Sequence, residues 1–252
     1  MLFQLDPRVI LIPVVQGIMI VYFLSITYQI LKRRRQRLNL IFSGFFICTI
    51  IGNLLNIIYF SMADENIILI LNFLTNFFVV LNAIFILTVN RIILESTIIY
   101  PVKKQNLYML FYGIILFCGM LILILLGLGL DGLILQPNAP FFGVKITPAP
   151  DHAPWWGLIF FIYVISFSVI FAVIPIIRTS LKIYKSFETK ELKKKWRYYF
   201  IGSLGAFSLF YLIIIGNLLN DINFKNIVSI YGISVLLWVS FMYYGIGFKL
   251  KT

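Results

Sequence analysis

Charged side chains, cysteine and histidine are all scarce in this sequence. Only 12% of its 252 residues are charged, and 61% are hydrophobic, whereas soluble domains are about a quarter charged and about half apolar. The chain is therefore too apolar to fold as an ordinary water-soluble domain. It has two cysteines, Cys48 and Cys118, and one histidine, His152, which excludes a disulfide framework and a cysteine–histidine zinc cluster.

The groups that carry chemistry inside membranes are missing as well. No Asp, Glu, Lys, Arg or His lies well inside a long apolar run, so neither a proton relay nor a Schiff-base lysine is expected. The sequence has no His-Glu-x-x-His motif, and a single histidine in a loop excludes a Ser-His-Asp triad at depth. We therefore expect no enzymatic activity, no catalytic residue, no metal site and no cofactor.

Long apolar runs dominate what is present. A helix needs about 20 apolar residues to cross a bilayer, and seven runs reach that length, separated by polar connections and without the alternation of a barrel. The sequence predicts an all-α polytopic membrane protein, a single domain of seven transmembrane helices. Their approximate ranges are 9–31, 38–61, 67–94, 107–130, 155–177, 198–219 and 227–248.

Lysine and arginine lie almost entirely on one side of these runs. Alternate connections, together with the C-terminal segment, carry 18 of the 21 cations on one side, and the other side holds only Arg8, Lys145 and Lys225. Because cytoplasmic loops are rich in Lys and Arg, we predict an N-terminus outside and a cytoplasmic C-terminus, in a multi-pass protein of the cell membrane. The net charge of +12 then points to the lipid bilayer as a partner, and not to nucleic acid.

Asparagine is the main polar residue inside the predicted helices. Amides in hydrocarbon form hydrogen bonds between helices, and most of these residues are interpreted as such packing contacts. The asparagines in the outer half have a second interpretation, a polar cavity that binds a ligand. These candidate ligand-binding residues are Asn53, Asn56, Asn72, Asn76, Asn217 and Asn220.

One hexamer, Ile-Gly-Asn-Leu-Leu-Asn, occurs twice, at 51–56 and at 215–220. Each copy lies near the outer end of a predicted helix and follows a basic cluster on the inner side. Two three-helix units joined by a central helix would place the copies equivalently, as in parallel-repeat carriers. Chance identity is the other explanation in a chain so rich in Ile, Leu and Asn.

The outer connection 131–154 holds five of the nine prolines. Proline stiffens a loop and stops a helix, so this Pro-rich outer loop is predicted to be either a lid over the outer mouth or a structured connector. Trp155 and Trp156 follow it, at the expected start of the fifth helix. Tryptophan at such a position typically anchors a helix at the membrane interface.

The inner stretch 178–197 is predicted to continue as helix out of the bilayer, and Pro175 is expected to kink the helix before it. Trp196 is interpreted as a second interface anchor. The cations of this stretch would contact anionic lipid headgroups or a separate protein. The predicted contact residues are Lys182, Lys185, Lys193, Lys194, Lys195 and Arg197.

Several short segments of the second half form a series. Ala-Pro-Trp-Trp-Gly stands at 153–157, and Arg-Thr-Ser-Leu-Lys ends the fifth predicted helix at 178–182. Lys-Trp-Arg-Tyr-Tyr-Phe-Ile-Gly opens the sixth at 195–202, Asn217 closes it, and Tyr-Tyr-Gly-Ile-Gly-Phe-Lys-Leu stands at 243–250. Together they resemble the seven-transmembrane sensor region at the N-termini of many prokaryotic histidine kinases and diguanylate cyclases.

The resemblance implies sensing, with the last helix leading to a cytoplasmic output domain. Since this chain ends at Thr252 without a phosphoacceptor histidine or an ATP-binding module, we expect a stand-alone receptor. It would bind a small or lipidic ligand and signal through a separate cytoplasmic protein. The alternatives are a small-solute transporter of 3+1+3 helix architecture and a structural subunit of a membrane complex.

Overall fold

A computed structural model describes residues 7–33, 36–62, 64–95, 101–130, 140–147 and 153–247. In this part of the chain, seven helical segments are long and apolar enough to cross a membrane, which confirms the multi-pass, all-α prediction. The first four spans are single helices, and the sixth is also one helix. They are α1 (Pro7–Arg33), α2 (Arg37–Phe60), α3 (Glu65–Leu94), α4 (Val102–Leu130) and α7 (Lys190–Leu219).

The fifth and seventh spans are each interrupted. The fifth consists of α5 (Leu158–Ser168), the π-helix η1 (Val169–Val173) and α6 (Ile174–Ser186). Pro175, where a kink is expected, lies in the first turn of α6 just after this π-helix, and proline lacks the N–H that a regular helix would need there. The seventh span consists of α8 (Ile222–Tyr231), the short 3-10 helix η2 (Gly232–Ser234) and α9 (Val235–Gly247).

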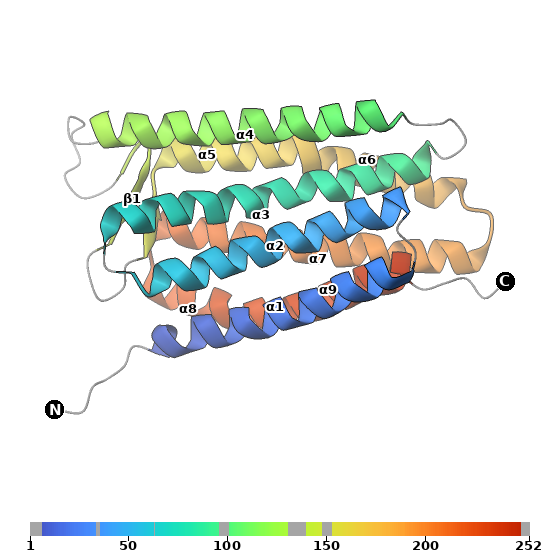
Figure 1. Cartoon of the computed structure of the whole chain (residues 1–252), viewed down its shortest axis with the longest axis horizontal. Coiled ribbons are helices and arrows are strands. Elements are labelled where there is room, and N and C mark those ends of the chain that lie inside the picture. The colour runs from blue at the N-terminus through green and yellow to red at the C-terminus, as the bar shows by residue number, and fades with distance from the viewer. Residues whose placement is uncertain are drawn as a thin grey trace.

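The spans run alternately up and down and leave two distinct ends (Figure 1). One end carries a two-stranded antiparallel sheet of β1 (Val144–Ile146) and β2 (Pro154–Trp156), and we call it the sheet end. The opposite end carries the turn between α6 and α7, and we call it the basic end. The described helix ends that border the connections predicted to be cytoplasmic lie at the basic end (Figure 1).

The small sheet is what the structure describes of the predicted outer loop. Lys145 lies opposite Trp155, and Thr147 N–H donates to the Ala153 carbonyl at 3.0 Å beyond the last pair. The prediction of a lid also involves residues 131–139 and 148–152, which lie outside the described residues. The described part of this loop is a short two-stranded element that contacts α3 through β1 and α7 through β2.

Two tryptophan predictions are wrong. Trp156 belongs to β2, since α5 begins only at Leu158, and its buried indole meets the Phe160 ring edge-on at 4.9 Å. Trp196 is also buried, and its indole N–H donates to the Ser180 carbonyl at 2.9 Å. Both side chains therefore pack inside the protein and do not anchor it at the membrane interface.

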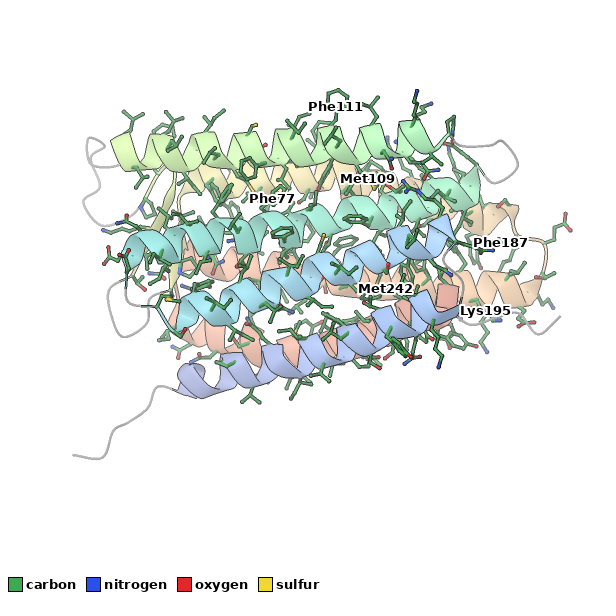
Figure 2. The ribbon with its side chains drawn as sticks, viewed as in Figure 1. Phe77, Met109, Phe111, Phe187, Lys195 and Met242 are labelled. Carbon is green, nitrogen blue, oxygen red and sulfur yellow. The ribbon has the colours of Figure 1, made fainter. Side chains whose placement is uncertain are left out.

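Helices α7 and α9 approach each other closely through glycine. A Cβ atom on Gly202 would lie 2.4 Å from the Trp238 carbonyl oxygen and 2.7 Å from the Met242 nitrogen. Reciprocally, a Cβ atom on Gly245 would lie 2.4 Å from the Tyr199 Cβ atom. Such small residues let helix backbones meet in membranes, where packing replaces the hydrophobic drive. Met242 lies inside the bundle, whereas Phe111 points outward from α4 (Figure 2).

Candidate ligand-binding cavity

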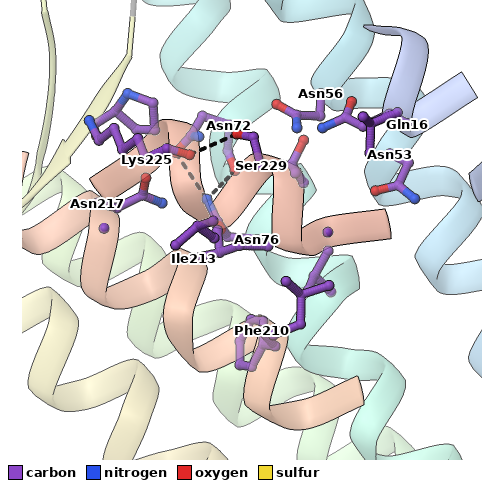
Figure 3. A pocket seen from close by; sticks show the side chains of 18 of the residues that line it. Gln16, Asn53, Asn56, Asn72, Asn76, Phe210, Ile213, Asn217, Lys225 and Ser229 are labelled. Carbon is purple, nitrogen blue, oxygen red and sulfur yellow. Dashed lines mark hydrogen bonds between the residues drawn. The ribbon is translucent and has the colours of Figure 1, made fainter. Parts of the chain in front are cut away.

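A cavity of ≈ 180 Å³ opens among the helices at the sheet end. Side chains from α1, α2, α3, α7, α8 and η2 line it, together with Ala153 and Pro154 at β2. Figure 3 shows amide side chains from several of these helices facing the same space. The polar lining residues are Gln16, Asn53, Asn56, Asn72, Thr75, Asn76, Asn217, Lys225 and Ser229.

Most of the predicted ligand-binding asparagines meet at this cavity. Asn53 and Asn56 come from the last turns of α2, Asn72 and Asn76 from α3, and Asn217 from the end of α7. They converge because antiparallel neighbours bring a C-terminal helix end beside an N-terminal one. Their role in binding a ligand stays a prediction.

The sixth predicted residue, Asn220, contributes indirectly. It lies outside the lining and caps the C-terminus of α7 in the left-handed conformation, with φ 51°. Asparagine tolerates this conformation better than most residues. Its side-chain Oδ1 accepts a hydrogen bond from the Lys225 ammonium at 2.6 Å. Asn220 therefore positions a cavity residue and ends α7 at the cavity.

Two of the asparagines hold each other within α3. Asn76 Nδ2 donates to the Asn72 backbone carbonyl at 2.8 Å and to Asn72 Oδ1 at 3.0 Å. These bonds lie within one helix, so the interhelical packing interpretation does not describe this pair. It does describe Asn82, whose Nδ2 donates across to Thr49 Oγ1 of α2 at 3.1 Å.

Three polar atoms of the lining have no hydrogen-bond partner. They are Gln16 Oε1, Asn53 Nδ2 and Thr75 Oγ1, and all three are buried. An unmatched buried donor or acceptor costs about 1–3 kcal/mol, and such groups are rare in folded proteins. This side of the cavity therefore offers hydrogen-bonding capacity that the protein itself leaves unused.

Lys225 is the residue that sequence reasoning missed. The sequence places it in an outer loop, whereas the structure places it in the first turn of the span Ile222–Ile246, where it is 7% exposed. Its ammonium also donates to the Pro154 carbonyl at 3.3 Å. Asp221 gave the signal: its side chain caps α8 by accepting from Phe224 N–H at 2.9 Å, and an N-cap there starts the helix before Lys225.

The cavity has an apolar floor. Met19, Val79, Leu209 and Phe210 line it, and four residues beyond Met19 on α1 lies Phe23, about 6 Å deeper along the helix. Phe23 begins a column of buried rings that we call the aromatic column, with successive centroids 4.7 to 6.2 Å apart. The aromatic column consists of Phe23, Phe46, Phe42, Tyr199 and Trp196.

The aromatic column ends at a hydrogen-bonded centre near the basic end. Asn90 of α3 is 0% exposed and its Nδ2 donates to Ser180 Oγ at 2.8 Å and to Thr179 Oγ1 at 3.2 Å, both on α6. The Tyr199 hydroxyl of α7 donates to Asn90 Oδ1 at 3.0 Å. One amide thus joins α3, α6 and α7 in the basic half of the bundle.

The predicted contact residues at the basic end are mostly accessible. Lys182, Lys185, Lys194 and Arg197 are exposed and Lys193 is half-buried. Lys195 differs, since it is 9% exposed and its Nζ lies 3.1 Å from Glu191 Oε1, which leaves it poorly placed to meet a lipid or a partner. Lys195 lies against the last turns of α9, since a Cβ atom on Gly245 would lie 2.7 Å from the Lys195 carbonyl oxygen.

No family model, no curated protein and no solved structure matches this chain. Its class rests on the seven apolar helices, which define an integral membrane protein of the multi-pass type. Its candidate site rests on the cavity at the sheet end.

Proposed function

We propose that this chain is a membrane receptor that binds a small ligand in the sheet-end cavity and signals through a separate cytoplasmic protein. One observation carries the proposal: a hollow, polar, partly unmatched site lies in the sheet half of the bundle, and a buried hydrogen-bonded centre that joins α3, α6 and α7 lies in the other half. A candidate ligand site in one half and a buried hydrogen-bonded centre in the other are an arrangement suited to sensing. The resemblance to the seven-transmembrane sensor region supports the same function.

The helices offer a route between the two halves. Helix α3 carries both Asn76 of the cavity and Asn90 of the hydrogen-bonded centre. Helix α7 carries both Asn217 of the cavity and Tyr199. A shift of either helix on ligand binding would act on the hydrogen bonds to α6, and hence on the turn between α6 and α7. Coupling between two sites requires an element with two states, and both sites must shift the equilibrium between those states.

The direction of the signal follows from the proposed orientation. We place the sheet end outside and the basic end in the cytoplasm, because cytoplasmic loops collect Lys and Arg. A reporter enzyme fused after Thr252 is expected to be active only in the cytoplasm, and a second reporter inserted after Phe60, between α2 and α3, only outside. The opposite pattern would reverse the orientation and with it the side from which the ligand arrives.

Occupying the cavity is expected to alter the basic end. The experiment uses Asn56→Cys in a Cys48→Ala, Cys118→Ser background, in nanodiscs, with methyl methanethiosulfonate as a small covalent occupant. Modification should change hydrogen exchange in the turn 187–189 about fivefold or more, the scale of a coupling near 1 kcal/mol. Mass spectrometry of peptides covering that turn measures the change.

The matched control keeps Cys118, which is exposed on α4 and does not line the cavity, in a Cys48→Ala background without the cavity cysteine. Its modification should leave exchange at 187–189 unchanged. Complete modification of Asn56→Cys with no change at the basic end would contradict signalling by this route.

The transporter is the second candidate, and the hexamer repeat favours it. Both copies reach the same cavity, the first through Asn53 and Asn56 and the second through Gly216 and Asn217. Reconstituted vesicles distinguish the two functions: a transporter would take up a solute that binds the cavity, with uptake lost in Asn53→Ala and Asn217→Ala. A receptor would bind the same solute without uptake.

A further inference from the structure

The three unmatched polar atoms of the cavity come from three different helices. Gln16 belongs to α1, Asn53 to α2 and Thr75 to α3. Asn53 and Thr75 are each 9% exposed, so their polar atoms have little bulk water to bond. Figure 3 shows the amides of Gln16 and Asn53 on the opposite side of the cavity from Lys225.

The chemistry of these atoms is mixed. Gln16 Oε1 can only accept a hydrogen bond, Asn53 Nδ2 can only donate one, and the Thr75 hydroxyl can do either. A carboxylate accepts but does not donate, so it leaves Gln16 Oε1 unmatched. An ammonium donates but does not accept, so it leaves Asn53 Nδ2 unmatched. A hydroxyl or an amide with an N–H satisfies both.

We propose that Gln16, Asn53 and Thr75 form a subsite for a neutral group that donates and accepts hydrogen bonds together, a hydroxyl or an amide. This inference rests on the proposed ligand-binding function of the cavity and names the chemical class of the ligand. The apolar floor of Val79 and Phe210 accommodates a short hydrocarbon portion of the same molecule. The cavity volume of ≈ 180 Å³ restricts the ligand to a small molecule.

Discrimination between neutral and charged probes tests the class. Acetamide and glycerol are titrated against the protein in nanodiscs, with acetate and methylammonium as charged probes of similar size, and dissociation constants are taken from saturation-transfer NMR. The neutral probes are expected to bind about tenfold more tightly than either charged probe, because sites that leave buried polar groups unmatched lose at least that factor.

Two substitutions locate the binding at the subsite. Thr75→Val removes the hydroxyl at nearly constant shape, and Asn53→Leu removes the amide; each is expected to weaken acetamide binding about tenfold. Thr27→Val is the matched control, since Thr27 Oγ1 is also buried without a partner but Thr27 does not line the cavity. The control should bind acetamide as the unsubstituted protein does.

Each contrary result overturns a definite statement. Acetate or methylammonium binding as tightly as acetamide would overturn the neutral class, while the cavity would remain a ligand site. Acetamide binding unchanged in both Thr75→Val and Asn53→Leu would overturn the subsite. No binding of any probe would mean that water alone occupies the subsite and would also overturn it; the labelling of Asn56→Cys then decides separately whether the cavity signals.

Discussion

Substituting Gly202 with alanine is expected to lower the stability of the bundle by about 2–4 kcal/mol, although alanine is the better helix former. The added methyl group would lie 2.4 Å from the Trp238 carbonyl oxygen and 2.7 Å from the Met242 nitrogen. Both are backbone atoms of α9, which cannot turn away as a side chain can. Helices α7 and α9 must therefore separate along their contact.

The reference for this prediction is Gly17→Ala on α1. No atom lies within 4 Å of a Cβ at Gly17, so only the gain in helix propensity remains, about 1 kcal/mol in the stabilising direction. Both variants replace a helical glycine with alanine, and we expect Gly202→Ala to lower the stability and Gly17→Ala to raise it. Thermal unfolding followed by circular dichroism in one detergent measures both. Equal effects would show that the glycine contact does not hold α7 against α9.

The seven spans were predictable because the bilayer imposes one simple requirement, about 20 apolar residues in a helix. Predicted and observed ranges agree within a few residues for α1, α2 and α3. They differ where a helix leaves the hydrocarbon, since hydropathy says nothing about helix in water. There, capping side chains determine where a helix begins or ends. For example, α7 begins at Lys190 because Thr189 Oγ1 accepts a hydrogen bond from Leu192 N–H at 3.4 Å.

The start of α5 shows a second limit of hydropathy. Trp155 and Trp156 carry no charge and directly precede the apolar helix, so they extend the predicted run to its N-terminal side. The structure pairs them with β1: Gly157 N–H donates to the Gly143 carbonyl at 2.7 Å, and α5 begins only after them, at Leu158. A contact between residues 14 positions apart in sequence is not a local pattern.

The sequence predicts which asparagines belong to the candidate site, but it does not predict what the neighbouring helices present to each of them. Helical spacing predicts which side chains of α3 share a face, and Asn72 and Asn76 do reach the cavity. Asn82 and Asn90 are the same residue type in the same helix, yet they bond to other helices. Spacing cannot separate the two groups, because the difference lies in what the neighbouring helix presents: Thr49 to Asn82, and a hollow to Asn76.

Asn90→Leu is expected to have the second large effect on stability, a decrease of about 2–4 kcal/mol in the free energy of unfolding. The side chain is 0% exposed and bonds to both α6 and α7. Leucine fills similar space, but Ser180 Oγ and the Tyr199 hydroxyl both lose this partner in a buried place. Each such bond inside a membrane contributes roughly 0.6–2 kcal/mol, and an unmatched hydroxyl adds its own penalty.

Asn82→Leu is the matched comparison, because it makes the same change on the same helix. Asn82 has one bond to α2, and its partner Thr49 Oγ1 keeps a second bond by donating to the Phe45 carbonyl at 2.9 Å. The free energy of unfolding of Asn82→Leu should therefore decrease by no more than about 1 kcal/mol. Thermal unfolding in one detergent compares the two variants, and similar losses would mean that Asn90 is one more packing contact.

A double substitution identifies the source of the Asn90 effect. If an unmatched Tyr199 hydroxyl causes part of the loss, then adding Tyr199→Phe to Asn90→Leu removes that penalty, and the double variant is more stable than the sum of the single effects predicts. Strict additivity would instead assign the loss to packing. The same double variant should still respond to acetamide, because neither residue lines the cavity, but modification of Asn56→Cys in it should no longer alter exchange at 187–189. Binding that persists while coupling disappears is the result that separates a receptor from a cavity with no output.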